Sequence, residues 1–312
     1  MLKSFIRHII NNFVAGFNEE NMNFWSDKIT SFSGNNSLRC GKNVLKVDNP
    51  LVMGILNLTP DSFYDGGRYN DMDARISQTE KMINEGASII DIGAVSTRPG
   101  AAAVSEEEEI MRLLPVIETL TYRYPETVFS VDTYRSNVVK LAAEAGIGII
   151  NDISGGSMDQ LLMDAVAISG LPYILMHMQG TPADMQLNPL YDNVGSEVNT
   201  FFEQKLKQLK NAGIKQAILD PGFGFGKSLE HNYSLLRQLN GFKKHGFPIL
   251  VGLSRKSMIY KLLQINPQEA LSGTSAINML AILNGADILR VHDVKEAVQV
   301  IKLAEAYIKA RE

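Results

Sequence analysis

The chain has 312 residues, of which 45% are hydrophobic and 21% are charged, an ordinary composition for a globular protein. This excludes a disordered or fibrous protein, and the formal net charge of -4 gives no overall field that would attract nucleic acid or an anionic membrane. The single cysteine, Cys40, cannot form an intramolecular disulfide or supply a thiolate zinc cluster, which favours a reducing compartment. We therefore expect a cytoplasmic protein.

The first 36 residues are predicted to form an extension, and residues 37–312 the main domain. Residues 1–16 are apolar with interspersed basic residues, but asparagines break the run and no small-residue cleavage site follows, so a short amphipathic helix is expected. Residues 18–36 are polar and irregular, which predicts a linker. No stretch elsewhere approaches the roughly 20 apolar residues that a membrane span requires.

Eight short apolar runs, rich in β-branched residues, follow one another from residue 50 onward. They begin at residues 51, 87, 127, 147, 172, 216, 248 and 286. Helical patterns separate most of them, at 72–85, 106–123, 136–145, 197–211 and 229–242. Several end in a glycine, where a left-handed C-cap is expected, at positions 86, 146, 213 and 285. This repeat predicts a (β/α)8 TIM barrel. An open doubly wound sheet is the alternative, but eight near-continuous apolar strands fit a closed barrel better.

A polar residue stands at the carboxyl end of each run, on the face where such barrels place their active sites. In chain order these are Asn57, Asp91, Asp132, Asn151, His177, Asp220, Lys256 and the pair Arg290 and His292. One such residue is usually a turn or helix cap. Polar residues at all eight ends indicate a site.

Several strand-end residues, together with Thr97 and Arg98 of the loop after the second strand, form groups with different chemistry. The first accepts hydrogen bonds from the edge of a flat heterocycle, such as a pterin or guanine, and consists of Asp132, Asn151 and Asp220. The second offers cations and a hydroxyl to a diphosphate and consists of Thr97, Arg98, Arg290 and His292. Asn57 adds a carbonyl ligand for Mg2+ shared with phosphate oxygens. The predicted ligand is a heterocycle that carries a diphosphate.

The glycine-rich segment 220–228, DPGFGFGKS, imitates nucleotide-binding signatures without matching either one. A Walker A loop requires glycine where Pro221 stands, and glycines at 222, 224 and 226 do not fit G-x-G-x-x-G. We expect a flexible loop after a barrel strand, whose glycines allow its backbone to approach neighbouring groups closely. Phe225 in this loop would be free to cover an aromatic ligand.

Other polar positions are expected to be structural. His177 lies on an apolar strand, which predicts a core or rim histidine. Of the neighbours Arg255 and Lys256, spacing from the strand favours Lys256 pointing inward. The acidic run at 106–109 predicts a solvated first helical turn, capped by Ser105.

Seven ordered motifs resemble those of the dihydropteroate synthases, folate-pathway enzymes inhibited by sulfonamides. They are NLTPDSFYDGG (57–67), DIGAVSTRPGA (91–101), SVDTYR, NDISGG, LDPGFGFGK, GLSRKS and LRVHDV. The resemblance extends from about Cys40 to the C-terminus. It implies a transferase that condenses (7,8-dihydropterin-6-yl)methyl diphosphate with 4-aminobenzoate to give 7,8-dihydropteroate and diphosphate, with diphosphate leaving before the amine attacks.

The resemblance also implies a role for each matching residue. It implies that Asn57 binds Mg2+ and that the pterin is held by Asp132, Asn151, Asp220 and Lys256. The diphosphate would be engaged by Thr97, Arg98, Arg290, His292 and the backbone of Val291. Two mobile loops, one with Asp61, Phe63 and Asp65 and one with Thr97, Arg98, Pro99 and Gly100, would close over the site. Together with Phe225, Ser254 and Lys256, these loops would build the 4-aminobenzoate pocket.

The residues expected to act in catalysis are Arg98, Lys256 and Asp132, and the family implies a homodimer formed through the last helices. Three other functions are weighed against this one. A corrinoid-linked methyltransferase domain has no use for the diphosphate cations, and a pterin-binding protein without turnover would have lost Arg98, Lys256 or Arg290. A scaffolding barrel would leave the strand ends chemically empty.

Overall fold

The structure, a computed structural model, describes residues 37–58, 68–95, 104–181, 185 and 189–310. The helix and linker expected in residues 1–36 lie outside the described residues, and the predicted domain boundary there stays a prediction. No helix among the described residues is long and apolar enough to cross a membrane.

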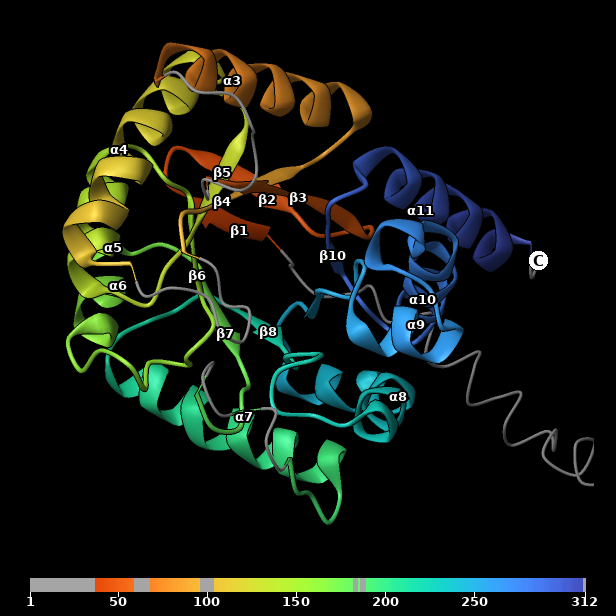
Figure 1. The fold of residues 1–312 in the computed structure, drawn as a ribbon. Helices are drawn as coiled ribbons and strands as arrows, with labels where there is room; N and C mark the ends of the chain where they lie inside the picture. The colour runs from red at the N-terminus through yellow and green to blue at the C-terminus, as the bar shows by residue number, and fades with distance from the viewer. Residues whose placement is uncertain (1–36, 59–67, 96–103, 182–184, 186–188, 311–312) are drawn as a thin grey trace, which may run out of the picture. The chain divides into compact units, whose positions relative to one another are not determined.

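Eight parallel strands form one sheet, in the order β8-β7-β6-β5-β4-β3-β10-β9. Their bounds are β3 Leu51–Asn57, β4 Ile89–Gly93, β5 Val128–Asp132, β6 Ile149–Asp152, β7 Tyr173–Met176, β8 Ala217–Asp220, β9 Leu250–Val251 and β10 Ile288–Val291. A parallel bridge between Leu219 and Ile249 joins the two ends of the sheet. The strands therefore close into the predicted barrel, with helices outside it (Figure 1).

The described helices are α3 Arg68–Glu85, α4 Glu106–Arg123, α5 Ser136–Glu144, α6 Leu162–Ser169, α7 Val194–Asn211, α8 Leu229–Arg237, α9 Ser257–Leu263, α10 Leu271–Leu283 and α11 Val294–Lys309. Short 3-10 helices are η2 Leu239–His245 and η3 Pro267–Glu269. The helix predicted over 229–242 thus ends at Arg237 and continues as η2, where Gly241 disfavours a regular α-helix. The four glycines at 86, 146, 213 and 285 all have positive φ, as predicted.

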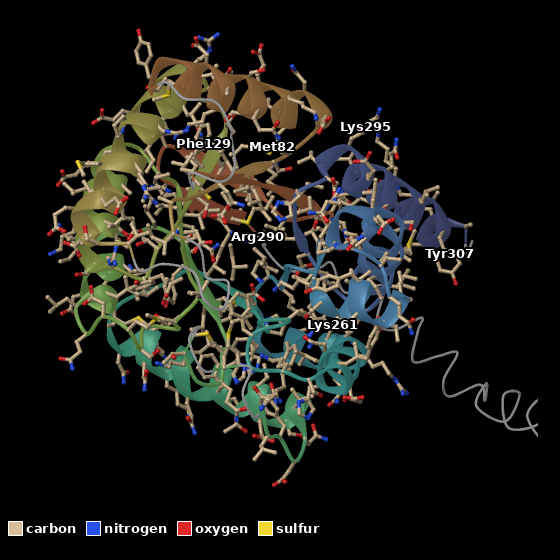
Figure 2. The ribbon with its side chains drawn as sticks, viewed as in Figure 1. Met82, Phe129, Lys261, Arg290, Lys295 and Tyr307 are labelled. Carbon is tan, nitrogen blue, oxygen red and sulfur yellow. The ribbon has the colours of Figure 1, made fainter. Side chains whose placement is uncertain are left out.

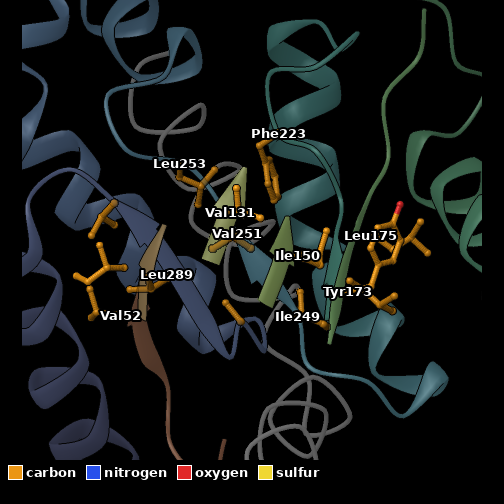
Figure 3. Close-up of a cluster of buried hydrophobic side chains, with 14 of the residues drawn as sticks. Val52, Val131, Ile150, Tyr173, Leu175, Phe223, Ile249, Val251, Leu253 and Leu289 are labelled. Atoms are coloured by element: carbon orange, nitrogen blue, oxygen red, sulfur yellow. The ribbon is translucent and has the colours of Figure 1, made fainter. Parts of the chain in front are cut away.

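Two hydrophobic clusters lie on the two faces of the sheet. The inner one takes an apolar residue from each strand: Met53, Ile89, Val128, Ile149, Ile174, Ile218, Leu250 and Ile288. The outer one lies between strands and helices, and Figure 3 shows Val52, Ile150, Val251 and Leu289 among its members. Because each strand is buried on both faces, its sequence is a near-continuous apolar run.

A hairpin that the sequence analysis did not predict covers the amino-terminal end of the barrel. Strands β1 (Ser37–Cys40) and β2 (Asn43–Lys46) pair antiparallel. Their apolar side chains join the inner cluster, and these are Leu38, Cys40, Leu45 and the adjacent Val47. Alternate strand residues share a face, so side chains two positions beyond the inner cluster also point into the barrel. Five of these are polar: Asp91, Ser130, Asn151, Asp220 and Arg290.

The start of α4 corrects one prediction. Ser105 caps the helix as expected, since its side chain accepts a hydrogen bond from the backbone N–H of Glu108 at 3.2 Å. The acidic run is not solvated throughout, because Glu109 is buried and accepts a hydrogen bond from Arg135 at 2.5 Å. Glu109 precedes the buried Leu113 by four residues, which places both on the face that packs on the sheet.

Candidate active site

Four side chains from four strands meet at the carboxyl ends of the barrel strands. Arg290 donates through Nε to Oδ2 of Asp91 at 2.7 Å and through a terminal nitrogen to Oδ2 of Asp132 at 2.8 Å. Asn151 donates through Nδ2 to the same Asp91 oxygen at 3.0 Å. Figure 2 shows Arg290 within the ring of strands. The carboxylate of Asp91 therefore joins Asn151 to Arg290, and Arg290 in turn joins them to Asp132.

Asp91 is the residue that the sequence analysis placed at a strand end but gave no role. Its side chain is fully buried, and its Oδ2 accepts from both Arg290 and Asn151. Its other oxygen, Oδ1, is buried without a hydrogen-bond partner in the part of the chain that the structure describes. The strand-end position was the signal that could have identified it. Asp91 fixes the orientation of the Asn151 amide, because Nδ2 of Asn151 must point toward the Asp91 carboxylate. The Oδ1 of Asn151 is then the acceptor that this amide can offer to a ligand.

The electrostatics of this cluster follow from burial and paired charge. Burial raises the pKa of Asp132, while the charge of Arg290 acts against that rise. Burial likewise raises the pKa of Asp220, and Lys256 opposes it. Burial lowers the pKa of Arg290, but Asp91 and Asp132 raise it overall, so the guanidinium stays charged. A cation held between two carboxylates is thus a fixed feature of the barrel mouth.

Lys256 points into the site and Arg255 points away, as the spacing predicted. The Nζ of Lys256 donates to the carbonyl oxygen of Phe223 and lies 4.6 Å from the centroid of the Phe225 ring. Arg255 has a left-handed backbone with φ of 54° and forms a bidentate ion pair with Asp293 at 2.9 and 2.8 Å. Burial lowers the pKa of Lys256 to about 8, with Asp220 acting in the opposite direction.

The glycine-rich loop makes the close approach that was predicted for it. Gly222 has φ of 70°, and a Cβ there would lie 1.8 Å from the carbonyl oxygen of His177. His177 itself is buried and structural, as expected: its ring lies edge-on to Phe201 at 4.9 Å and beside Lys227. Burial lowers the pKa of His177 to about 3, and Lys227 adds to this, so the imidazole is neutral.

The remaining predicted residues divide by whether the structure describes them. Ser254 accepts a hydrogen bond from the backbone N–H of His292 at 3.3 Å, which links the ends of β9 and β10. Val291 is buried at the end of β10, and Asn57 is half-buried at the end of β3. Phe63, Thr97, Arg98, Pro99 and Gly100, together with Asp61 and Asp65, lie outside the described residues.

The described side chains offer few ligands for a metal ion. Among the described residues, no group of three or more His, Cys, Asp or Glu side chains is arranged to hold one. Mg2+ takes near-octahedral oxygen ligands and is usually bound by few protein groups together with substrate phosphates and water. A single amide oxygen from Asn57 fits that arrangement, in which most ligands come from a bound diphosphate.

Comparison with known proteins assigns this barrel to a class. Residues 53–292 match the family model described as pterin binding enzyme, so the chain belongs to the pterin-binding enzymes. The dihydropteroate synthase of Escherichia coli K12 is 50% identical over 270 residues, which cover 86% of this chain and 95% of the relative. That of Haemophilus influenzae is 45% identical over 268 residues, covering 85% and 97%. Within its class, the chain is a member of the dihydropteroate synthase family.

Solved structures give the same assignment. A Yersinia pestis dihydropteroate synthase in complex with a sulfonamide drug matches with a TM-score of 0.83 and 45% identity, covering 88% of this chain and 99% of that one. A Xanthomonas albilineans enzyme with 4-aminobenzoic acid matches with a TM-score of 0.82 and 41% identity, covering 88% and 98%. These relatives confirm the predicted family, and they favour a synthase over the methyltransferase alternative.

Proposed function

We propose that the chain condenses (7,8-dihydropterin-6-yl)methyl diphosphate with 4-aminobenzoate in folate biosynthesis, giving 7,8-dihydropteroate and diphosphate. Family membership supports this activity, and a Xanthomonas albilineans relative has been solved in complex with 7,8-dihydropteroate. The observation that carries the proposal is the cluster of Asp91, Asp132, Asn151 and Arg290, because it presents hydrogen-bond acceptors and one fixed cation at the face where barrel enzymes act.

The pterin would be held by the acceptors of the barrel mouth. Asp132 and Asp220 supply carboxylates for its ring N–H and amino groups, and Asn151 supplies its Oδ1 as an acceptor, since its Nδ2 is bonded to Asp91. The guanidinium of Arg290 is planar and charged, so it also provides a surface against which a flat ring can stack. Lys256 completes the edge of this pocket beside Asp220.

The reaction proceeds by departure of diphosphate followed by attack of the amine. The bond between the methylene carbon and the diphosphate oxygen breaks, and its electron pair leaves with diphosphate. The methylene cation is stabilised by the dihydropterin ring and by the nearby carboxylate of Asp132. The amine nitrogen of 4-aminobenzoate then forms the new bond to carbon and loses a proton to solvent. Lys256 and the ring of Phe225, 4.6 Å from it, would hold the aminobenzoate.

The diphosphate would be bound by cationic and hydroxyl groups, among them Arg98, Thr97 and His292. Mg2+, held by Asn57 and the diphosphate oxygens, would neutralise the negative charge of the leaving group. Arg290 contributes a second positive charge that stays in place, because Asp91 and Asp132 fix its guanidinium.

The protein is proposed to act in the cytoplasm as a homodimer formed through its last helices. Large apolar side chains are exposed on α9, α10 and α11, and these are Leu262, Leu263, Leu280, Leu303 and Tyr307. Exposed apolar patches of this kind often mark interfaces between proteins. Sedimentation of the wild type and of Leu303→Glu tests this: a dimer that the substitution converts to monomer supports it, and a monomeric wild type contradicts it.

The activity is tested with purified protein, the dihydropterin methyl diphosphate, 4-aminobenzoate and Mg2+. Both diphosphate release and the joined product are followed, and each component is omitted in turn. Product that depends on both organic substrates and on Mg2+ is the expected result. Pterin binding without diphosphate release would instead indicate a binding protein and would overturn the proposal.

A further inference from the structure

A buried lysine outside the proposed ligand-binding groups joins two segments beneath the amine pocket. The side chain of Lys227 is only 3% exposed. Its Nζ lies 3.0 Å from Nδ1 of His177 and donates to the carbonyl oxygens of Gly222 and Phe225, each at 3.0 Å. Burying an amino group is costly unless its N–H groups are hydrogen-bonded. Here the neutral imidazole and two carbonyls accept those bonds.

The two segments joined by Lys227 are the end of β7 and the glycine-rich loop after β8. His177 belongs to the first, and its own carbonyl oxygen also lies 3.4 Å from Nζ of Lys227. Gly222 and Phe225 belong to the second, which has no α-helix or strand to fix it between residues 221 and 227. The position of this loop therefore depends on side-chain contacts, and Nζ of Lys227 provides four of them, two to His177 and two within the loop.

The opposite side of the same loop contacts the proposed amine pocket. The carbonyl oxygen of Phe223 accepts from Nζ of Lys256, and the ring of Phe225 lies 4.6 Å from that atom. Phe225 thus bonds to Lys227 through its carbonyl and faces Lys256 with its ring. A shift of the loop would move the ring of Phe225 and the carbonyl oxygen that holds Nζ of Lys256, so it would affect both groups that are proposed to hold the aromatic amine.

We propose that Lys227 and His177 form a buried clamp, whose role is to position Phe225 and Lys256 for binding of the aromatic amine substrate. This inference rests on the proposed function. The clamp should act mainly on the amine, because the pterin acceptors Asp132 and Asn151 are held through Asp91 and Arg290 and make no bond to the loop. Two other residues of the pterin pocket, Asp220 and Lys256, do bond to the loop, so a smaller change in pterin binding is expected as well. Lys227 is a positioning residue, since its buried Nζ is bonded to His177, Gly222 and Phe225.

The test is steady-state kinetics of full-length Lys227→Met, with each substrate varied in turn. We expect the KM for 4-aminobenzoate to rise about tenfold or more, while the KM for the dihydropterin methyl diphosphate changes by less than about threefold. A merely structural residue would lower thermal stability or the active fraction without this selective change. A KM for 4-aminobenzoate within about twofold of wild type would overturn the clamp.

A matched pair at His177 separates the hydrogen bond from the packing. His177→Asn keeps an acceptor near the position of Nδ1 and is expected to retain most of the affinity for 4-aminobenzoate, whereas His177→Leu should behave like Lys227→Met. Equal effects of the two His177 variants on the KM for 4-aminobenzoate would contradict the clamp. This test does not depend on the Lys227→Met protein, so it holds even when that variant does not fold.

A readout without turnover keeps the two proposals apart. Amide hydrogen exchange of residues 222–226 should be faster in Lys227→Met and His177→Leu than in wild type or His177→Asn. Wild-type protein that makes no product would refute the proposed function, whereas unchanged exchange in an active enzyme would refute the clamp alone.

Discussion

Replacing Asp91 by asparagine tests whether one buried carboxylate organises the pterin site. The substitution keeps the shape of the side chain but removes the charge that pairs with Arg290 at 2.7 Å. Breaking a buried ion pair by removing one partner costs about 3–5 kcal/mol. Because Arg290 keeps Asp132 and its side chain is 23% exposed, we expect a loss near the lower limit, ~3 kcal/mol. This corresponds to a fall in Tm of roughly 6–12 °C.

The same substitution should weaken pterin binding, because a neutral amide is a weaker acceptor than a carboxylate and holds Nδ2 of Asn151 less firmly. Loss of one buried, well-oriented hydrogen bond is worth about 1–3 kcal/mol, so the Kd for the dihydropterin methyl diphosphate should rise about fivefold or more. Calorimetric titration without 4-aminobenzoate measures this directly. The matched control is Asp287→Asn, which removes an equally buried carboxylate that binds Lys243 at 2.5 Å, at the other end of β10.

The control should lower the Tm by a similar amount and leave the Kd unchanged. If Asp91→Asn lost stability as the control does but bound the pterin substrate within about twofold of wild type, the organising role of Asp91 would be refuted.

Three further predictions concern other parts of the molecule. A lysine is cationic below its pKa, and burial lowers that of Lys256 to about 8, so kcat/KM should fall as the pH rises through about 8; a profile that stays flat up to pH ~10 would contradict a role for the cation. Chelation of Mg2+ should stop turnover, and Asn57→Ala should raise the Mg2+ concentration for half-maximal rate about tenfold, whereas an unchanged Mg2+ dependence would remove Asn57 from this role. Glu109→Gln leaves Arg135 without its buried partner and should lower the free energy of unfolding, measured in urea, by ~3 kcal/mol. The control Glu107→Gln changes an exposed residue and should leave the free energy of unfolding unchanged. Equal free energies of unfolding for the two variants would show that the Glu109 pair contributes nothing.

Much of the fold could be predicted because it is encoded locally. A parallel strand covered on both faces requires an apolar run, and the following helix requires a 3.6-residue pattern and a cap, so each unit is visible within about 30 residues of sequence. Missed features depended on context. The segment from residue 37 was predicted to belong to the domain, but the β1–β2 hairpin was not, because Leu38 and Leu45 find their apolar partners only in a cluster with residues from all eight barrel strands.

The sequence by itself determined the barrel, the position of polar residues at its carboxyl ends and the inward direction of Lys256. Only the tertiary structure decided which of those residues act together. Asp91 meets Asn151 across 60 residues and Arg290 across 199, and Lys227 meets His177 across 50. Contacts of such separation arise when the strands close into a ring, because closure brings side chains from distant segments to one mouth, and no local pattern encodes their pairing.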